Sequence, residues 1–474
     1  MTENQLRQLP PVDKLLNTDE AKAFAELYSR DLVVEATRAV LEELRQGLIR
    51  KEEEVFPEEA LSHQSILKKI EKYCRSKLTS SLRKAINATG VIIHTGLGRA
   101  VLSKAAQEAI LKAIEGYCNL AIDSETGQRG HRDVHLNTLL CELTGAEAAT
   151  VVNNNAAATM LILNTLAKGK EVILSRGQLV EIGGSFRMPE VMASSGAILR
   201  EVGTTNKTHL RDYSSAISGE TAALMRVHHS NYRIVGFAEE PSIEELAELA
   251  KKHNLPLIDD LGSGALVDLK EFGLETEPLV QRSIRAGVDV ACFSGDKLIG
   301  GPQAGIIVGK ASVIERVRKN PLARALRVGK MTVAGMEATL RLFLNREKLG
   351  EYHPVYRMFS VSLKDIERRA QKVAKQLRAQ IKSEAEISVV DGGSQVGSGS
   401  VPVETIPTKL LRIKPIADSA EALARKLRLS QPPVFPRVHK EAVLLDFRTI
   451  QEDEDLIVSK VLLALLKEGR NDHD

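Results

Sequence analysis

The pattern that most restricts the fold of this chain lies between residues 145 and about 344, where short apolar runs alternate with helical segments. The apolar runs occupy residues 148–152, 172–174, 222–227, 255–258 and 288–293, and helical spacing marks residues 156–167, 243–253 and 279–286. Neighbouring parallel strands need a crossover connection, which is usually a helix. The alternation therefore predicts an α/β region with a mainly parallel sheet.

The regions on either side have different patterns, so three domains are expected. Residues 1–85 are helical in pattern, residues 86–345 hold the alternating region, and residues 346–474 mix strands with helices. In the last region, strands are expected at 389–390, 410–413 and 442–445 and a helix at 419–427. The expected architecture is a helical N-terminal domain, a large α/β domain and a small α+β C-terminal domain.

Composition narrows the class of protein. The 474 residues carry a net charge of +3, so any basic surface must be local. The four cysteines have no CxxC spacing and fit neither a zinc site nor a disulfide framework, which favours a reduced compartment. The N-terminus lacks the pattern of a signal peptide, and no apolar run is long enough to span a bilayer. We expect a cytoplasmic protein without a membrane span or a bound metal.

Polar side chains follow the ends of three predicted strands, where parallel sheets bind their ligands. Asn231, Asp260 and Lys297 come in this order, with separations of 29 and 37 residues. A lysine can form a Schiff base with pyridoxal phosphate (PLP), and an aspartate can keep the pyridine nitrogen protonated. An asparagine can donate to the phenolic oxygen of the ring. The order predicts a PLP-dependent enzyme, although a surface turn would be the simpler interpretation of the SGDK loop alone.

Further candidates for cofactor binding follow the predicted strands at 148–152, 172–174 and 222–227; Asn231 follows the last of these too. They are Asn154, Asn155, Ala156, Ala157, Gln178 and His229. The first four form a polar turn that opens a helix of small residues, whose backbone N–H groups can hold a phosphate. A plain Asn-rich helix cap is the alternative. Gln178 follows the strand at 172–174, and His229 can lie over or beside the ring.

Two questions stay open at this point. Asp259 and Asp260 point to opposite faces if both lie in the strand, so the pattern does not decide which one pairs with the ring nitrogen. Residues 68–84 contain seven basic residues against one glutamate, which indicates either a solvated helix face or contact with nucleic acid. Arg99 follows a glycine-rich turn, where its guanidinium can face an anion or solvent.

Several longer stretches are similar to a known family. They are LPPVDKLL (9–16), INATGVIIHTGLGRA (86–100), SGDKLIGGPQAG (294–305) and PLARALRVGKMT (321–332). They resemble the bacterial selenocysteine synthase family, the L-seryl-tRNA(Sec) selenium transferases, which are similar to fold-type I PLP-dependent enzymes. The resemblance covers the leader and the whole core.

The resemblance implies an activity and a set of partners. The expected reaction converts L-seryl-tRNA(Sec) to L-selenocysteinyl-tRNA(Sec) with selenophosphate, through a PLP-bound aminoacrylyl intermediate. The family also implies a tRNA-binding N-terminal domain and a homo-oligomer built as a ring of dimers. One alternative is a related PLP-dependent lyase that performs β-elimination on a small amino acid or sugar acid. Another is a tRNA-binding protein without catalysis.

The resemblance also implies roles for single residues. Lys297 is the expected Schiff-base lysine, and Asp260 is favoured over Asp259 as the partner of the ring nitrogen. The positions that match the family's selenophosphate pocket are Arg99, Arg324 and Arg327. Asp296 lies beside the lysine and either tunes its charge or supports the loop. The sequence does not identify the acid that assists loss of the seryl hydroxyl, nor the basis of tRNA and selenium discrimination.

Overall fold

The computed structural model describes residue 6 and residues 8–50, 61–184, 186–274, 277–401 and 404–468. The chain forms two compact units, Met1–Lys84 and Ala85–Asp474. Within the described residues the first unit is helical and the second contains two large sheets. No helix in these ranges is both long and apolar enough to cross a bilayer.

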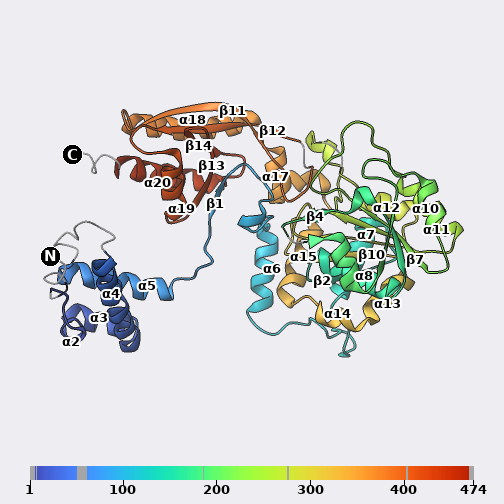
Figure 1. Cartoon of the computed structure of the whole chain (residues 1–474), viewed down its shortest axis with the longest axis horizontal. Helices are drawn as coiled ribbons and strands as arrows, with labels where there is room; N and C mark the ends of the chain where they lie inside the picture. Colours follow the sequence, from blue (N-terminus) through green and yellow to red (C-terminus); the bar gives the residue numbers. More distant parts are fainter. Residues whose placement is uncertain are drawn as a thin grey trace. The chain divides into compact units, whose positions relative to one another are not determined.

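The first unit consists of α2 (Val12–Leu16), α3 (Asp19–Leu27), α4 (Arg30–Arg50) and α5 (His63–Leu78) (Figure 1). The Thr18 hydroxyl caps α3 by accepting a hydrogen bond from the Ala21 N–H at 3.2 Å. Apolar side chains at helical spacing, including Val33, Val40 and Leu44, form the core of this unit.

The larger sheet of the second unit is the one that the alternating pattern predicted. Within the described residues its strand order is β2-β10-β9-β8-β7-β3-β6. The strands are β2 (Ala148–Val152), β3 (Glu171–Ser175), β6 (Ile198–Val202), β7 (Thr221–Val227), β8 (Leu257–Gly262), β9 (Val290–Ser294) and β10 (Gly305–Gly309). Strands β6, β3, β7, β8 and β9 are parallel, and β10 is antiparallel to β9 and β2. The predicted α/β class with a mainly parallel sheet is confirmed.

Helices cover both faces of this sheet because alternate strand residues point to opposite sides. Val172 and Leu174 pack into one core with α8 (Asn155–Ala167), α9 (Met188–Ser195) and α13 (Ala311–Lys319). Ile173 packs into the other with α7 (Val134–Thr144), α11 (Ile243–Lys252), α12 (Val280–Ala286) and α15 (Lys330–Leu342). Each fully buried aliphatic side chain contributes about 1.5–3 kcal/mol relative to exposure. Burial on both faces holds the strand ends in place.

A second sheet has the order β1-β13-β14-β12-β11. Its strands are β1 (Ile86–Ala88), β11 (Ala385–Ser394), β12 (Ile406–Pro415), β13 (Val434–His439) and β14 (Ala442–Asp446). A separate core joins it to α18 (Leu363–Gln380), α19 (Ala420–Leu429) and α20 (Asp455–Glu468). Strand β1 pairs in parallel with β13, so a segment that precedes the larger sheet in sequence completes the C-terminal one.

The remaining elements connect these parts. They are α6 (Lys104–Ile114), β4 (Glu181–Ile182), β5 (Phe186–Arg187), α10 (Leu210–Ala216), α14 (Pro321–Ala325), α16 (Leu349–Tyr352) and α17 (Pro354–Ser360). After β11, the loop at residues 395–401 returns to the segment that follows β1. There the Ile92 N–H donates to the Gln395 carbonyl at 2.9 Å, and the Ile93 N–H donates to the Val396 carbonyl at 2.7 Å. Further along this loop, a Cβ at Gly399 would lie 2.7 Å from the carbonyl oxygen of Ser230, three residues after β7, so the loop reaches the end of a strand of the larger sheet.

Candidate active site

Lys297 lies in the loop between β9 and β10 and is only 6% exposed. The loop is closed by two backbone hydrogen bonds of 2.8 Å, from the Gly295 N–H to the Ala304 carbonyl and from the Gly301 N–H to the Gly295 carbonyl. Burial lowers the pKa of the Lys297 ammonium group, and the positive charge of Arg99 lowers it further. This environment favours the neutral amine, which is the form that acts as nucleophile or base.

Asp260 lies at the end of β8, on the sheet face that α8 covers. Its Oδ1 accepts a hydrogen bond from Asn155 Nδ2 at 2.8 Å, and its Oδ2 accepts one from Thr159 Oγ1 at 2.8 Å. Burial nevertheless raises the pKa of the carboxyl group, while these bonds and the charge of Lys297 oppose the rise. The charge of Asp260 has no salt-bridge partner among the described residues, so a bound cation would stabilise it.

The neighbouring Asp259 faces the other way, as the alternation of a strand predicts. Arg226 binds it with two hydrogen bonds of 2.8 Å, one from Nε and one from Nη2. This bidentate pair already neutralises the Asp259 charge. Asp260 is therefore the carboxylate available near Lys297.

The polar turn that was predicted to hold a phosphate, Asn154 to Ala157, forms the start of α8. Asn154 caps the helix through its Oδ1, which accepts a hydrogen bond from the Ala157 N–H at 2.9 Å. A Cβ at Gly305 would lie 2.1 Å from the Asn154 carbonyl oxygen, so only glycine allows β10 to approach this turn. The N–H groups of Asn155 and Ala156 belong to the first turn, where a helix binds anions. The Asn155 side chain is directed to Asp260.

Gln178, His229 and Asn231 lie around the ends of β3 and β7. Gln178 is buried, and its Oε1 accepts a hydrogen bond from the Val227 N–H at 2.9 Å. His229 places its Nε2 2.9 Å from the Gly177 carbonyl and 3.0 Å from Glu240 Oε1.

Asn231 is exposed, and its Nδ2 donates to the Glu181 carbonyl at 2.7 Å. The structure thus brings Gln178 and His229 together, whereas the Asn231 amide, in the same loop as His229, is directed to the Glu181 carbonyl. Its expected contact with the phenolic oxygen stays a prediction.

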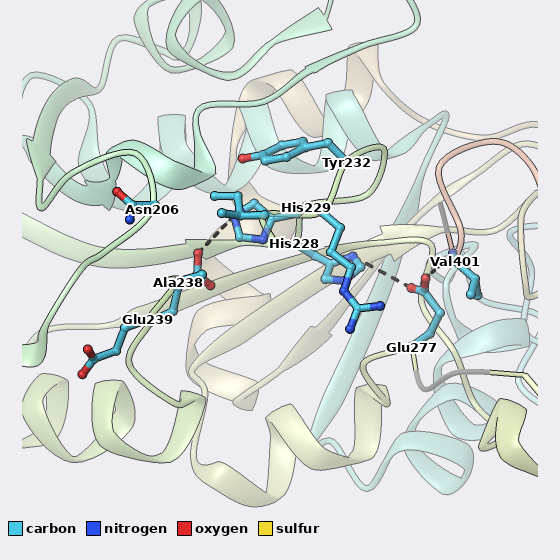
Figure 2. A pocket seen from close by; sticks show the side chains of 11 residues that line it. Asn206, His228, His229, Tyr232, Ala238, Glu239, Glu277 and Val401 are labelled. Carbon is cyan, nitrogen blue, oxygen red and sulfur yellow. Dashed lines mark hydrogen bonds and ion pairs between the residues drawn. The ribbon is translucent and has the colours of Figure 1, made fainter. Parts of the chain in front are cut away.

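A cavity of about 430 Å³ opens beside these residues, and His228, His229, Tyr232 and Glu277 contribute to its lining (Figure 2). In Figure 2 the two histidines point in different directions, His228 toward Glu277 and His229 toward the segment around Ala238. His228 follows directly after the last residue of β7, so the end of that strand enters the cavity wall.

Arg99 forms a bifurcated contact with Asp296, in which the single atom Nη1 donates to Oδ1 at 2.9 Å and to Oδ2 at 2.8 Å. The pair connects the turn after β1 with the lysine loop. Arg99 has a left-handed backbone with φ of 63°, which follows Gly98 at φ 92°. The pair places the guanidinium close enough to Lys297 to affect its pKa.

Arg324 and Arg327 lie elsewhere in the same unit, where they help to line a second cavity of about 380 Å³. Arg129 and Arg132 lie in the same wall. Burial lowers the pKa of Arg132, and the charges of Arg327, Arg129 and Arg324 lower it further. These four guanidinium groups form an anion-attracting cluster, and Arg99 is not part of its lining.

Sequence reasoning missed several of these residues. Thr159 lies four residues after Asn155 on the same helix face, so helical spacing contained a signal for it. Arg129 and Arg132 occur in the basic stretch RGHR at 129–132, which was a second usable signal. The sequence contained no pattern that indicated Glu277, because only folding brings this residue close to the end of β7.

Comparison with known proteins agrees with this geometry. The profile of the L-seryl-tRNA selenium transferase family matches residues 85–451, and the profile described as selenocysteine synthase N terminal matches residues 6–45. A D-glucosaminate-6-phosphate ammonia-lyase structure shares the fold, with a TM-score of 0.57 and 21% identity over 84% of this chain and 98% of that one.

Full-length relatives are similar to the chain as well. The L-seryl-tRNA(Sec) selenium transferase of Alkaliphilus metalliredigens is 47% identical over 462 residues, which cover 98% of this chain and 99% of the relative. That of Solidesulfovibrio magneticus is 48% identical over 462 residues, with coverage of 97% and 98%. The chain therefore belongs to the L-seryl-tRNA selenium transferase family and is a PLP-dependent enzyme, as the order of Asp260 and Lys297 predicted.

Proposed function

We propose that this chain converts L-seryl-tRNA(Sec) to L-selenocysteinyl-tRNA(Sec) and takes its selenium from selenophosphate. The observation that carries the proposal is the buried Lys297 amine beside the buried Asp260 carboxylate, in a chain whose full-length relatives bear this name. A PLP-dependent lyase would use the same pair. The anion cluster around Arg324 and Arg327 and the basic stretch at residues 68–84 favour a larger, anionic substrate.

The residues present fit PLP. Asp260 is buried without a salt-bridge partner in the described parts of the chain, and a protonated ring nitrogen would supply the missing positive charge. We assign the ring nitrogen to Asp260, the aldehyde to Lys297 and the phosphate to the first turn of α8 at Asn154–Ala157. Gln178 and His229 are assigned to the edge of the cofactor site. When bound, PLP withdraws electrons from the α-carbon of the substrate.

The chain's own groups then handle protons and anions. The Lys297 amine, whose lowered pKa favours the neutral form, accepts the α-proton of the seryl group. Asp296 holds Arg99 beside this amine. Arg99, Arg324 and Arg327 are the proposed ligands of selenophosphate, because guanidinium groups match its oxygen atoms. Since Arg99 lies apart from the other two within one chain, a homo-oligomer with shared sites would bring the three together.

The first unit is the proposed tRNA-binding part. Lys68, Lys72, Arg75 and Lys77 are exposed on α5, and exposed bases at this density neutralise phosphates. Replacing Lys68 and Lys72 by glutamate should weaken tRNA binding and reduce its salt dependence, measured by filter binding at several salt concentrations. An aminoacyl-tRNA substrate also implies a cytoplasmic location.

The direct test incubates seryl-tRNA(Sec) and selenophosphate with the wild type and with Lys297→Ala. We expect selenocysteinyl-tRNA(Sec) from the wild type, no product from Lys297→Ala, and loss of the visible cofactor band in that variant. Lys252→Ala, at an exposed lysine of α11, is the matched control. A wild type that releases free pyruvate or ammonia from a small substrate, without a product on tRNA, would instead support the lyase.

A further inference from the structure

Glu277 is a buried acid that connects three segments near the active site. It is 6% exposed, and its Oε2 accepts a hydrogen bond from Ser263 Oγ at 2.8 Å. Its Oε1 accepts one from the Val401 N–H at 2.5 Å, in the loop that follows β11. Both oxygens are thus held in place, yet the charge of Glu277 has no lysine or arginine salt bridge in the described chain.

His228 also lies close to the Glu277 carboxylate. Its Nδ1 lies 3.9 Å from Glu277 Oε2, and Figure 2 shows the two side chains directed toward each other across the cavity wall. The Nδ1 atom is buried and has no hydrogen-bond partner among the described residues. The backbone N–H of His228 donates to the Asp260 carbonyl at 2.9 Å, which ties the imidazole to the strand that carries the cofactor's aspartate.

The electrostatic surroundings link His228 with Lys297. Burial lowers the pKa of His228, Glu277 raises it, and the charges of His229 and Arg226 lower it while that of Asp259 raises it. Glu277 also raises the pKa of Lys297, so one carboxylate acts on both groups. The net direction of the His228 pKa is downward, so the opposing effect of Glu277 is what favours the protonated imidazole that a general acid needs.

Other polar groups in this region already have partners. The Nε2 of His229 lies close to the Gly177 carbonyl and to Glu240, and the Tyr232 hydroxyl donates to the same carbonyl. Asp296 is bound by Arg99. His228 is the cavity residue whose imidazole remains available to a substrate.

We propose that His228 donates the proton with which the seryl hydroxyl departs, and that Glu277 is the residue that positions it. This inference rests on the proposed function. Glu277 faces Nδ1, so the Nε2 proton of His228 is the one delivered to the substrate. The α-proton goes to the Lys297 amine, and its electron pair forms the Cα=Cβ bond. The Cβ–O bond breaks, and its electron pair leaves on the oxygen, which takes the Nε2 proton and departs as water.

The first test does not depend on activity. Deuterium exchange at the imidazole C2 position, followed by mass spectrometry across pH, measures the pKa of individual histidines in the full-length protein. Glu277→Gln should lower the pKa of His228 by roughly 1 unit, because an opposite charge at this distance is removed. Glu248→Gln, at an exposed site on α11, should leave the His228 pKa unchanged. An unaltered His228 pKa in Glu277→Gln would overturn the role of Glu277.

The second test is kinetic. His228→Asn and His228→Gln should lower kcat for selenocysteinyl-tRNA(Sec) formation by about 10²-fold or more with little change in KM. Glu277→Gln should shift the basic limb of the kcat–pH profile to lower pH, which a merely structural role would not do. His253→Asn is the matched control.

Different results would overturn the role of His228 and the proposed function. An active wild type with equally active His228 variants overturns this inference alone. A wild type that forms no product overturns the proposed function and this inference with it.

Discussion

Lowering the pH should destabilise this protein through His353, which contacts the backbone of the Lys297 loop between β9 and β10. His353 is fully buried, and its Nε2 lies 2.9 Å from the Ile299 carbonyl, two residues after Lys297. The rings of Phe343 and Tyr356 lie edge-on, with centroids 5.4 and 4.9 Å away. The Nε2–H donates to the carbonyl in this arrangement, so Nδ1 is the unprotonated nitrogen.

The size of the expected loss of stability follows from the change in the pKa of His353 on folding. Burial lowers the pKa of His353 from 6.5 to about 4. Between these values the unfolded chain binds a proton that the folded chain does not, so stability falls as the pH falls from 6.5 toward 4. One pKa unit corresponds to about 1.4 kcal/mol, and the full shift therefore costs about 3 kcal/mol of unfolding free energy at pH 4.

The assay is urea unfolding of the wild type and His353→Gln at pH 7.5 and at pH 4. Glutamine can still donate to the Ile299 carbonyl but does not titrate in this range. The stability advantage of the wild type should shrink by about 3 kcal/mol at the lower pH. An equal wild-type advantage over His353→Gln at both pH values would refute the reasoning.

Two further predictions concern the sheet that carries the site. Arg226→Ala should destabilise the protein by about 3–5 kcal/mol, because it leaves the Asp259 carboxylate buried and unpaired. Arg282→Ala, which removes a surface ion pair, should cost less than about 1 kcal/mol in the same thermal unfolding experiment. Gly305→Ala should weaken cofactor retention, measured by equilibrium dialysis, because its Cβ would lie 2.1 Å from the Asn154 carbonyl and displace the first turn of α8. Unchanged retention would mean that this turn does not hold the phosphate.

Much of the fold could be predicted because periodicity is local. Runs such as 222–227 and 288–293 became β7 and β9 with little change in their ends. The partner of β1 could not be predicted, because its pairing with β13 joins residues far apart in sequence and only packing selects it. Likewise, nothing in the chain before folding indicated that Glu277 would approach His228.

Some features of the active site could likewise be predicted from the sequence, and others could not. Lys297 and Asp260 could be identified from their order after strands, since the carboxyl ends of parallel strands meet at one edge. The choice between Asp259 and Asp260 required the folded structure, because two adjacent aspartates in one strand look alike in the sequence pattern. In the structure Arg226 binds Asp259, whereas Asn155 and Thr159 bind Asp260. Three selenophosphate arginines were expected together, but within one chain Arg99 pairs with Asp296 and only the other two share a cavity.

The amino-acid sequence by itself determined the α/β class, the PLP chemistry and the family, because these depend on periodicity, on residue order and on specific motifs. The tertiary structure decided which charges are neutralised and which are left available. Arg226 removes Asp259 from consideration, burial and Arg99 lower the pKa of Lys297, and a loop from the smaller sheet fixes Glu277 beside His228. Such effects depend on distance and dielectric environment, which exist only once the chain is folded.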